Sequence, residues 1–167
     1  MDAEWGPSQR LSDVFAHPWN MTLGAIQDNS LVREISKRMA EQNKALGIHY
    51  NFSPSVDVNN NSKNPIIGNR SFGEDPVNVY KKAKAYIQGH RDAGIFTSIK
   101  HFPGHGDTDK DSHKTLPVIK GDIKRLNSVE LYPFKRLIED GLAESVMLAH
   151  LSVPALDKKY PSSLSYK

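Results

Sequence analysis

The chain contains no cysteine among its 167 residues. Disulfide bonds, thiolate metal sites and a cysteine nucleophile are therefore excluded, although this absence does not fix the cellular compartment. No apolar stretch approaches the roughly 20 residues that a membrane-spanning helix requires. The excess of basic over acidic residues is small, with a net charge of +3, and is weak support for a nucleic-acid partner. The sequence thus predicts neither a membrane span nor a nucleic-acid partner.

What the chain does contain is typical of one soluble, folded domain. Of its residues, 38% are hydrophobic and 25% are charged, which argues against wholesale disorder. A chain of this length buries about two-thirds of the surface of its unfolded state, enough for a real hydrophobic core. Residues 1–6 lack the basic and apolar regions of a signal peptide.

Three short segments have the pattern of buried strands that run into polar loops. They are rich in β-branched or aromatic residues, end in Pro, Gly or polar residues, and cover residues 47–58, 94–102 and 144–150. A helical pattern precedes each one, with Asp28 and Asp75 among the candidate N-caps. The apolar residues that mark the three helices are Leu31, Ile35 and Met39; Tyr80, Ala83 and Ile87; and Leu131, Phe134 and Ile138. This alternation predicts an α/β fold with a parallel sheet, in which sites form at the loops after the strands.

The loop at residues 100–113, KHFPGHGDTDKDSH, holds most of the chemistry-bearing side chains. Its composition alone is typical of a solvated loop, but Lys100 and His101 continue directly from an apolar strand. We therefore expect them at the carboxyl-end rim of the sheet, pointing toward a pocket. His101 and His105 have the spacing of a zinc-binding pair on a helix, but Pro103 between them disfavours a helix by about 3 kcal/mol. A loop that gathers both histidines and an aspartate around a metal stays open as an alternative.

Asp111-Ser112-His113 is the second feature of this loop. A carboxylate that accepts a hydrogen bond from one imidazole nitrogen fixes the tautomer and raises the imidazole pKa, so the ring becomes a proton donor near neutral pH. Taken alone, such a triplet fits a surface position equally well. The glycines at positions 104 and 106 lack the spacing of a phosphate-binding loop. They are better explained as permitting tight turns that let the following segment swing over a pocket.

These residues resemble glycoside hydrolase family 3, and more narrowly its bacterial β-N-acetylglucosaminidase branch. The resemblance rests on KHFPGHG with the downstream D-S-H, on NFSPSVDVNNNSKNPIIGNRSFGEDP and on the D-x-E-x-G segment at residues 2–6. It runs from Asp2 to about Pro161. The resemblance implies a (β/α)8 TIM barrel and a retaining hydrolysis, without a cofactor or metal, that removes non-reducing N-acetylglucosamine from β-linked saccharides.

The resemblance also implies roles for individual residues. Asp111 and His113 correspond to the acid/base dyad of the family. The residues expected to bind sugar hydroxyls, or to support those that do, are Asp2, Arg10, Arg70, Lys100, His101 and Asp57. The correspondence of Arg10 is looser than the others. Asp57 is expected to support the basic residues from the neighbouring strand, and a purely structural role at the rim explains it equally well.

One element of the family pattern is not found in this sequence. The nucleophile of the family is an Asp in an S-D-x-x-x-M segment after A-H-x-x-x-P, and only the latter occurs here, at residues 149–154. A complete barrel needs about 250 residues. We therefore expect a fragment of one catalytic barrel domain, roughly its second to fifth βα units. Its expected partners in the full-length protein are the rest of the barrel and, where the protein has one, a C-terminal domain. Its location, cytoplasmic or exported, stays open.

Two alternative functions remain open at this point. A metal-dependent hydrolase on a similar barrel would contain stoichiometric metal. A non-catalytic module that binds N-acetylglucosamine would bind the sugar without turnover, and the missing nucleophile gives this reading some weight.

Overall fold

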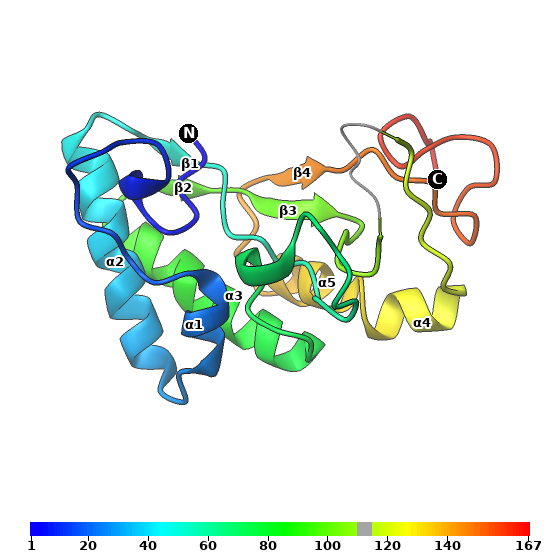
Figure 1. Cartoon of the computed structure of the whole chain (residues 1–167), viewed down its shortest axis with the longest axis horizontal. Coiled ribbons are helices and arrows are strands. Elements are labelled where there is room, and N and C mark those ends of the chain that lie inside the picture. Colours follow the sequence, from blue (N-terminus) through cyan, green and yellow to red (C-terminus); the bar gives the residue numbers. More distant parts are fainter. Residues whose placement is uncertain (110–114) are drawn as a thin grey trace.

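The computed structural model describes residues 1–109 and 115–167 (Figure 1). Asp111 and His113, the expected acid/base pair, lie outside the described residues. The remaining chain forms an α/β fold in which helices and parallel strands alternate. The described helices and strands are η1 (Pro7–Gln9), α1 (Asn20–Ala25), α2 (Asn29–Ala45), β1 (Tyr50–Asn51), η2 (Gly68–Arg70), α3 (Pro76–Asp92), β2 (Phe96–Thr97), β3 (Ile99–Phe102), α4 (Ile123–Ser128), α5 (Tyr132–Glu139) and β4 (Val146–Leu148).

The strands pair in parallel, as the alternation of elements predicts. Strand β1 pairs with β2, and β3 pairs with β4 in the register Ile99 to Val146. Only Ser98 separates β2 from β3, and a parallel bridge joins Ser55 to Lys100. The three expected strand segments therefore lie side by side, with residues 96–102 in the middle. Their carboxyl ends meet at one edge of the sheet, where Lys100 and His101 lie.

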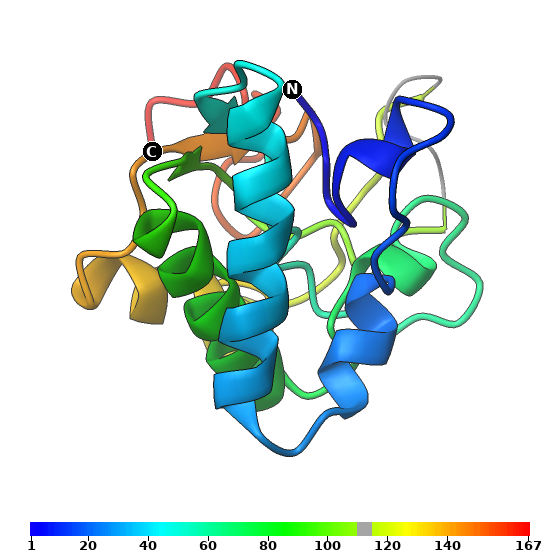
Figure 2. The ribbon, with the colours of Figure 1, turned by 90° about the vertical axis from the view of Figure 1, so that its left-hand side faces the viewer.

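The two long helices begin at the caps that the sequence indicates. The Asp28 side chain accepts a hydrogen bond from the Ser30 N–H, and Asp75 accepts from the N–H groups of the first turn of α3. Helices α2 and α3 run side by side against the sheet (Figure 2). They approach closely at Gly89, where an added Cβ would lie 2.3 Å from the Arg33 carbonyl oxygen. A glycine is required there because the helix backbones nearly touch.

The buried face of α2 differs from the expected one. Leu31 is 48% exposed, whereas Val32 is fully buried together with Met39. Ile138 in α5 is likewise exposed, whereas the adjacent Leu137 is buried beside Phe134. In each case two adjacent apolar residues compete for one buried position, and the tertiary packing buries the neighbour of the residue in the periodic pattern. Leu31 and Ile138 mark their helices in the sequence but lie outside the core.

The main core lies between the sheet and helices α2, α3 and α5. Its largest members include Phe72, Tyr86, Ile99 and Phe134. A second cluster, around Ile119, Leu126 and Leu151, supports the loops beyond β4. Within the described residues no helix is both long and apolar enough to cross a bilayer.

Candidate active site

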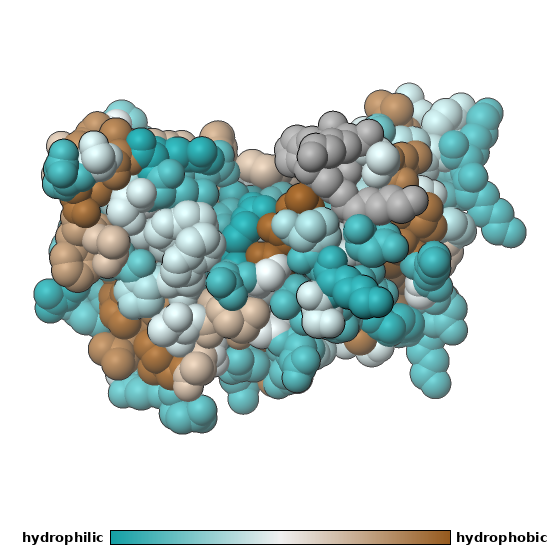
Figure 3. Space-filling model, viewed as in Figure 1, coloured by the Kyte–Doolittle hydropathy of each residue, from teal (hydrophilic) through white to brown (hydrophobic). Residues whose placement is uncertain are grey.

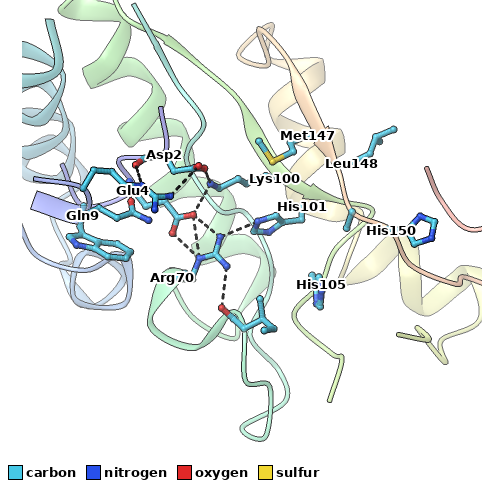
Figure 4. A pocket seen from close by; sticks show the side chains of 14 residues that line it. Asp2, Glu4, Gln9, Arg70, Lys100, His101, His105, Met147, Leu148 and His150 are labelled. Atoms are coloured by element: carbon cyan, nitrogen blue, oxygen red, sulfur yellow. Dashed lines mark hydrogen bonds and ion pairs between the residues drawn. The ribbon is translucent and has the colours of Figure 1, made fainter. Parts of the chain in front are cut away.

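A cavity of about 620 Å³ opens at the carboxyl ends of β3 and β4. Near the centre of the face in Figure 3, hydrophilic surface adjoins a smaller hydrophobic area. The described residues that line the cavity are Asp2, Glu4, Trp5, Gln9, Arg10, Ile66, Arg70, Lys100, His101, His105, Met147, Leu148, Ala149 and His150. In Figure 4 the charged side chains gather on one side, and Met147, Leu148 and His150 lie on the other.

Glu4 is the centre of the charged side. Its side chain is fully buried, and its Oε1 accepts from Arg70 Nη2 at 2.7 Å while Oε2 accepts from Arg70 Nε at 2.9 Å. Lys100 Nζ lies 2.7 Å from the same Oε1. Burial alone would raise the pKa of the Glu4 carboxyl, but its hydrogen bonds and ion pairs with Arg70 and Lys100 outweigh burial and lower the pKa. Glu4 is therefore ionised and fixes both cations in place.

Asp2 and Arg10 extend this network toward the mouth of the cavity. Lys100 Nζ contacts Asp2 Oδ1 at 2.8 Å, and Arg10 Nη2 contacts Asp2 Oδ2 at 3.2 Å. Burial opposes ionisation of Asp2, but the hydrogen bond and charge of Lys100, with Arg10, lower the pKa of the carboxyl. Lys100 is thus held between two carboxylates, and its amine is directed at the cavity although its side chain is only 2% exposed.

His101 has a defined tautomer because of its two neighbours. Arg70 Nη2 lies 3.0 Å from His101 Nε2, and a guanidinium carries only donors, so Nε2 must accept. The ring proton is then on Nδ1, which donates to Asp57 Oδ2 at 2.7 Å. The orientation of the His101 ring is therefore fixed from both sides.

Asp57 is fully buried and does not line the cavity. Besides the imidazole of His101, it accepts from the backbone N–H of His105 at 2.6 Å and from the Ser55 hydroxyl at 2.8 Å. Burial would raise the pKa of Asp57, but these interactions, led by His101, hold it well below its ordinary value. Asp57 consequently acts on the cavity through His101, whose ring it orients, and it anchors the backbone at His105.

The glycines of the loop after β3 allow a close approach to neighbouring backbone. Gly104 has a φ of 125°, and a Cβ on Gly106 would lie 1.8 Å from the Val58 carbonyl oxygen. His105 between them is 1% exposed, and its Nδ1 contacts the Thr108 hydroxyl at 2.6 Å. The tight turns that the sequence predicts are therefore present. The prediction that the following segment lies over a pocket concerns residues 110–114, which are outside the described residues.

The structure brings six of the eight sequence-predicted residues to one place. Asp2, Arg10, Arg70, Lys100 and His101 line the cavity, and Asp57 lies directly beneath His101. Sequence reasoning gave no role to Glu4 or His150, and it considered His105 only as a metal ligand. Glu4 stands two residues after Asp2, a spacing that places both carboxylates on one side of an extended segment, and this signal could have identified it.

No group of three His, Asp or Glu side chains within residues 1–109 and 115–167 is arranged to hold a metal ion. The rings of His101 and His105 have their centroids 6.3 Å apart, and the Nδ1 of each already has a protein partner.

The profile of the glycosyl hydrolase family 3 N-terminal domain matches residues 1–167. The chain belongs to glycoside hydrolase family 3. A curated relative, β-hexosaminidase A of Pseudoalteromonas piscicida, is 40% identical over 162 residues, which cover 94% of this chain and 27% of the relative. Several similar curated relatives are bacterial proteins named β-hexosaminidase, and the chain spans between 27% and 49% of their length.

Solved structures of family 3 have the same fold as this chain. The β-N-acetylglucosaminidase of Paenibacillus sp. str. FPU-7 superposes with a TM-score of 0.93 at 43% identity, over 98% of this chain and 31% of that protein. CbsA of Thermotoga neapolitana, solved with zinc bound, superposes with a TM-score of 0.89 at 32% identity, over 98% of this chain and 35% of CbsA.

Proposed function

We propose that this chain forms the sugar-binding part of a β-N-acetylglucosaminidase that hydrolyses β-linked, non-reducing N-acetylglucosamine. The observation that carries the proposal is the buried cluster of Glu4, Arg70 and Lys100 at the carboxyl ends of parallel strands. Sugar hydroxyls bind well to charged donors that are fixed before the substrate arrives. The similarity to proteins named β-hexosaminidase gives the aminosugar as the substrate class.

The charged side of the cavity fits a neutral sugar. The carboxylates of Asp2 and Glu4 pair with the cations of Arg10, Arg70 and Lys100, and the buried carboxylate of Asp57 lies directly beneath His101. Lys100 and Arg70 supply donors, and Asp2, at the mouth, supplies an acceptor. A ligand that offers hydroxyls can therefore exchange its hydrogen bonds with water for hydrogen bonds with this network.

The chemical steps rest on the family resemblance. His113 donates a proton to the departing glycosidic oxygen, and Asp111 holds the imidazole in the required tautomer. A retaining mechanism also needs a carboxylate nucleophile on the opposite face of the sugar ring. We propose that a segment not contained in these 167 residues supplies it. A histidine donor leaves no negative charge after donation, so attack by phosphate in place of water is a second possible outcome of the same site.

We further propose that the chain corresponds to roughly the second to fifth βα units of an eight-stranded barrel. Its strands expose large apolar side chains, with Phe96 59% exposed and Leu148 52% exposed, which further strands and helices of a barrel would cover.

The isolated chain is expected to be inactive and poorly stable for that reason. Purified residues 1–167 should not cleave 4-nitrophenyl N-acetyl-β-glucosaminide measurably, whereas the full-length protein should. The comparison uses equal concentrations of both proteins, with circular dichroism to record the fold of each. Cleavage by residues 1–167 at a rate near that of the full-length protein would refute the requirement for a further segment.

Substrate capture should depend on Arg70. In the full-length protein, Arg70→Ala removes a charged donor and should raise KM by about ten- to a hundredfold, with a smaller change in kcat. Steady-state kinetics on an aryl N-acetyl-β-glucosaminide test this. The matched control is Arg33→Ala, because Arg33 forms an ion pair with Asp92 at the surface. An unchanged KM for Arg70→Ala would count against a sugar-binding role.

Metal analysis separates this proposal from the metal-dependent alternative. The proposal expects no stoichiometric metal in the active full-length protein, and activity that survives treatment with a chelator. A non-catalytic binding module is separated by turnover, because it would bind N-acetylglucosamine at full length and release no product.

A further inference from the structure

Ala3 stands between Asp2 and Glu4, and its backbone is held by the side chain of Asn51 in β1. The Ala3 N–H donates to Asn51 Oδ1 at 3.0 Å, and Asn51 Nδ2 donates to the Ala3 carbonyl at 3.0 Å. Both residues are fully buried. Alternate residues of an extended segment point to opposite sides, so Ala3 points away from the cavity that Asp2 and Glu4 line (Figure 4). Asn51 therefore holds, from behind, the segment that carries both carboxylates.

Behind Asn51 lies His90 of α3, a fully buried histidine. A backbone N–H only donates and a carbonyl only accepts, so the contacts with Ala3 fix which end of the Asn51 amide is nitrogen. That nitrogen has a second hydrogen and lies 3.0 Å from His90 Nε2, which must accept. The imidazole proton is then on Nδ1, 2.7 Å from the Ser36 hydroxyl, and Ser36 donates to the Tyr86 carbonyl at 2.6 Å. Each of these side-chain hydrogens therefore has a defined acceptor.

The imidazole of His90 is fixed in charge and in plane as well. Burial lowers the pKa of His90 to about 3, so the ring is neutral at physiological pH and Nε2 is free to accept. The Tyr86 ring stacks on the imidazole with the centroids 4.5 Å apart. The Tyr86 hydroxyl also donates to the Glu4 carbonyl at 3.0 Å. Helix α3 thus contacts the carboxylate segment directly at Glu4 and, through Asn51, at Ala3.

The stability of the fold does not by itself require such a network. Apolar side chains of similar volume stabilise a core at least as well, and a buried polar group costs stability unless its hydrogen bonds are made. The network adds a fixed position for the backbone between Asp2 and Glu4. Lys100 Nζ lies 2.8 Å from Asp2 Oδ1 and 2.7 Å from Glu4 Oε1, so a shift of the segment by about 1 Å would break these contacts.

We propose that Asn51 and His90 are positioning residues for sugar binding. His90 fixes the Asn51 amide, the amide fixes the backbone of Ala3, and this backbone sets where the carboxylates of Asp2 and Glu4 lie. The substrate is that of the proposed function, on which the inference rests. Two residues that do not line the cavity therefore control substrate capture within it.

The first test is Asn51→Ala in the full-length protein. It should raise KM for 4-nitrophenyl N-acetyl-β-glucosaminide about tenfold and leave kcat within about threefold of the wild-type value, because the donors and acceptors for the sugar are displaced but present. The matched control is Asn43→Ala. Asn43 in α2 is equally buried, and its side chain has no hydrogen-bond partner among the described residues. An effect of Asn51→Ala on KM no larger than that of Asn43→Ala would overturn the inference.

The variants His90→Gln and His90→Asn separate positioning from a structural role. The Gln oxygen can lie near the position of Nε2 and accept from Asn51, whereas the shorter Asn side chain reaches only the position of Nδ1, next to Ser36. Both variants remove the ring and should lower stability to denaturant alike. His90→Asn should nevertheless raise KM about fivefold more than His90→Gln does. Equal KM values for the two variants would overturn the role of His90, and this contrast decides the inference if Asn51→Ala does not fold.

Crystal structures of the Asn51→Ala and Asn43→Ala proteins separate this inference from the proposed function, because they require no sugar. Asn51→Ala should displace the Asp2 carboxylate from its contact with Lys100, and Asn43→Ala should retain that contact. A wild-type protein that does not hydrolyse N-acetylglucosaminides would refute the proposed function, and the displaced carboxylate would still support the positioning role. An Asp2 carboxylate that keeps its contact with Lys100 in Asn51→Ala would overturn that role.

Discussion

Glu4→Gln in the full-length protein should lower the free energy of unfolding by about 3 kcal/mol and strongly raise KM. The side chain of Glu4 is fully buried, and it neutralises Arg70 and Lys100 at once. Removing one member of a buried ion cluster leaves the other charges desolvated and without compensation, which costs more than the cluster contributes when intact. Arg70 and Lys100 would then reorient, and the substrate would lose both donors. Denaturant unfolding and steady-state kinetics measure the two effects.

The pH dependence of stability identifies the Glu4 charge as the cause. The pKa of Glu4 is lowered from its ordinary value of 4.5, so its contribution is present above that pH and is lost as the pH falls through the folded-state pKa. Glu4→Gln should flatten this part of the stability profile. Glu139→Gln is the control, since Glu139 pairs with Arg136 at the surface and should matter by less than about 1 kcal/mol. If both variants changed the pH profile of stability equally, the ionised Glu4 side chain would not be the group that stabilises the Arg70 and Lys100 cluster.

His113→Ala should slow the cleavage of natural saccharides by about 10²- to 10⁴-fold, the range for loss of a general acid. An alkoxide departs poorly without a proton, whereas an activated phenolate departs without help. The same variant should therefore retain most of its kcat/KM on 2,4-dinitrophenyl N-acetyl-β-glucosaminide. The ratio kcat/KM is the quantity to compare, because it reports the first, proton-assisted step.

The control for this prediction is His49→Ala, an exposed histidine that is not part of the cavity lining. It should leave both substrates unaffected. Equal damage by His113→Ala to the natural and to the activated substrate would exclude His113 as the proton donor.

The sequence was sufficient to predict the fold class and much of the cavity. Local signals decide these features: Asp28 and Asp75 cap helices because their side chains meet N–H groups two or three residues away. Lys100 and His101 could be placed at the rim because they follow an apolar strand directly. The buried stripe of α2 could not be predicted with the same success, because Leu31 and Val32 are adjacent and only the contacts of the folded protein choose between them.

The surroundings of Glu4 and His150 depend on residues that are distant in sequence. Glu4 lies in an irregular segment, and its burial arises only when Arg70 and Lys100 meet it in the folded chain. His150 belongs to the A-H-x-x-x-P segment, but only the fold brings Ser163 to its Nδ1. Loop residues of this kind carry no periodic signal, so the sequence can flag their chemistry but not their partners.

The most direct test of the account is a crystal structure of the full-length protein with N-acetylglucosamine bound. The account predicts the sugar in the cavity after β3 and β4, with its hydroxyls within hydrogen-bond distance of Lys100, Arg70 and Asp2. A sugar bound elsewhere, with the Glu4 cluster in contact only with water, would contradict it.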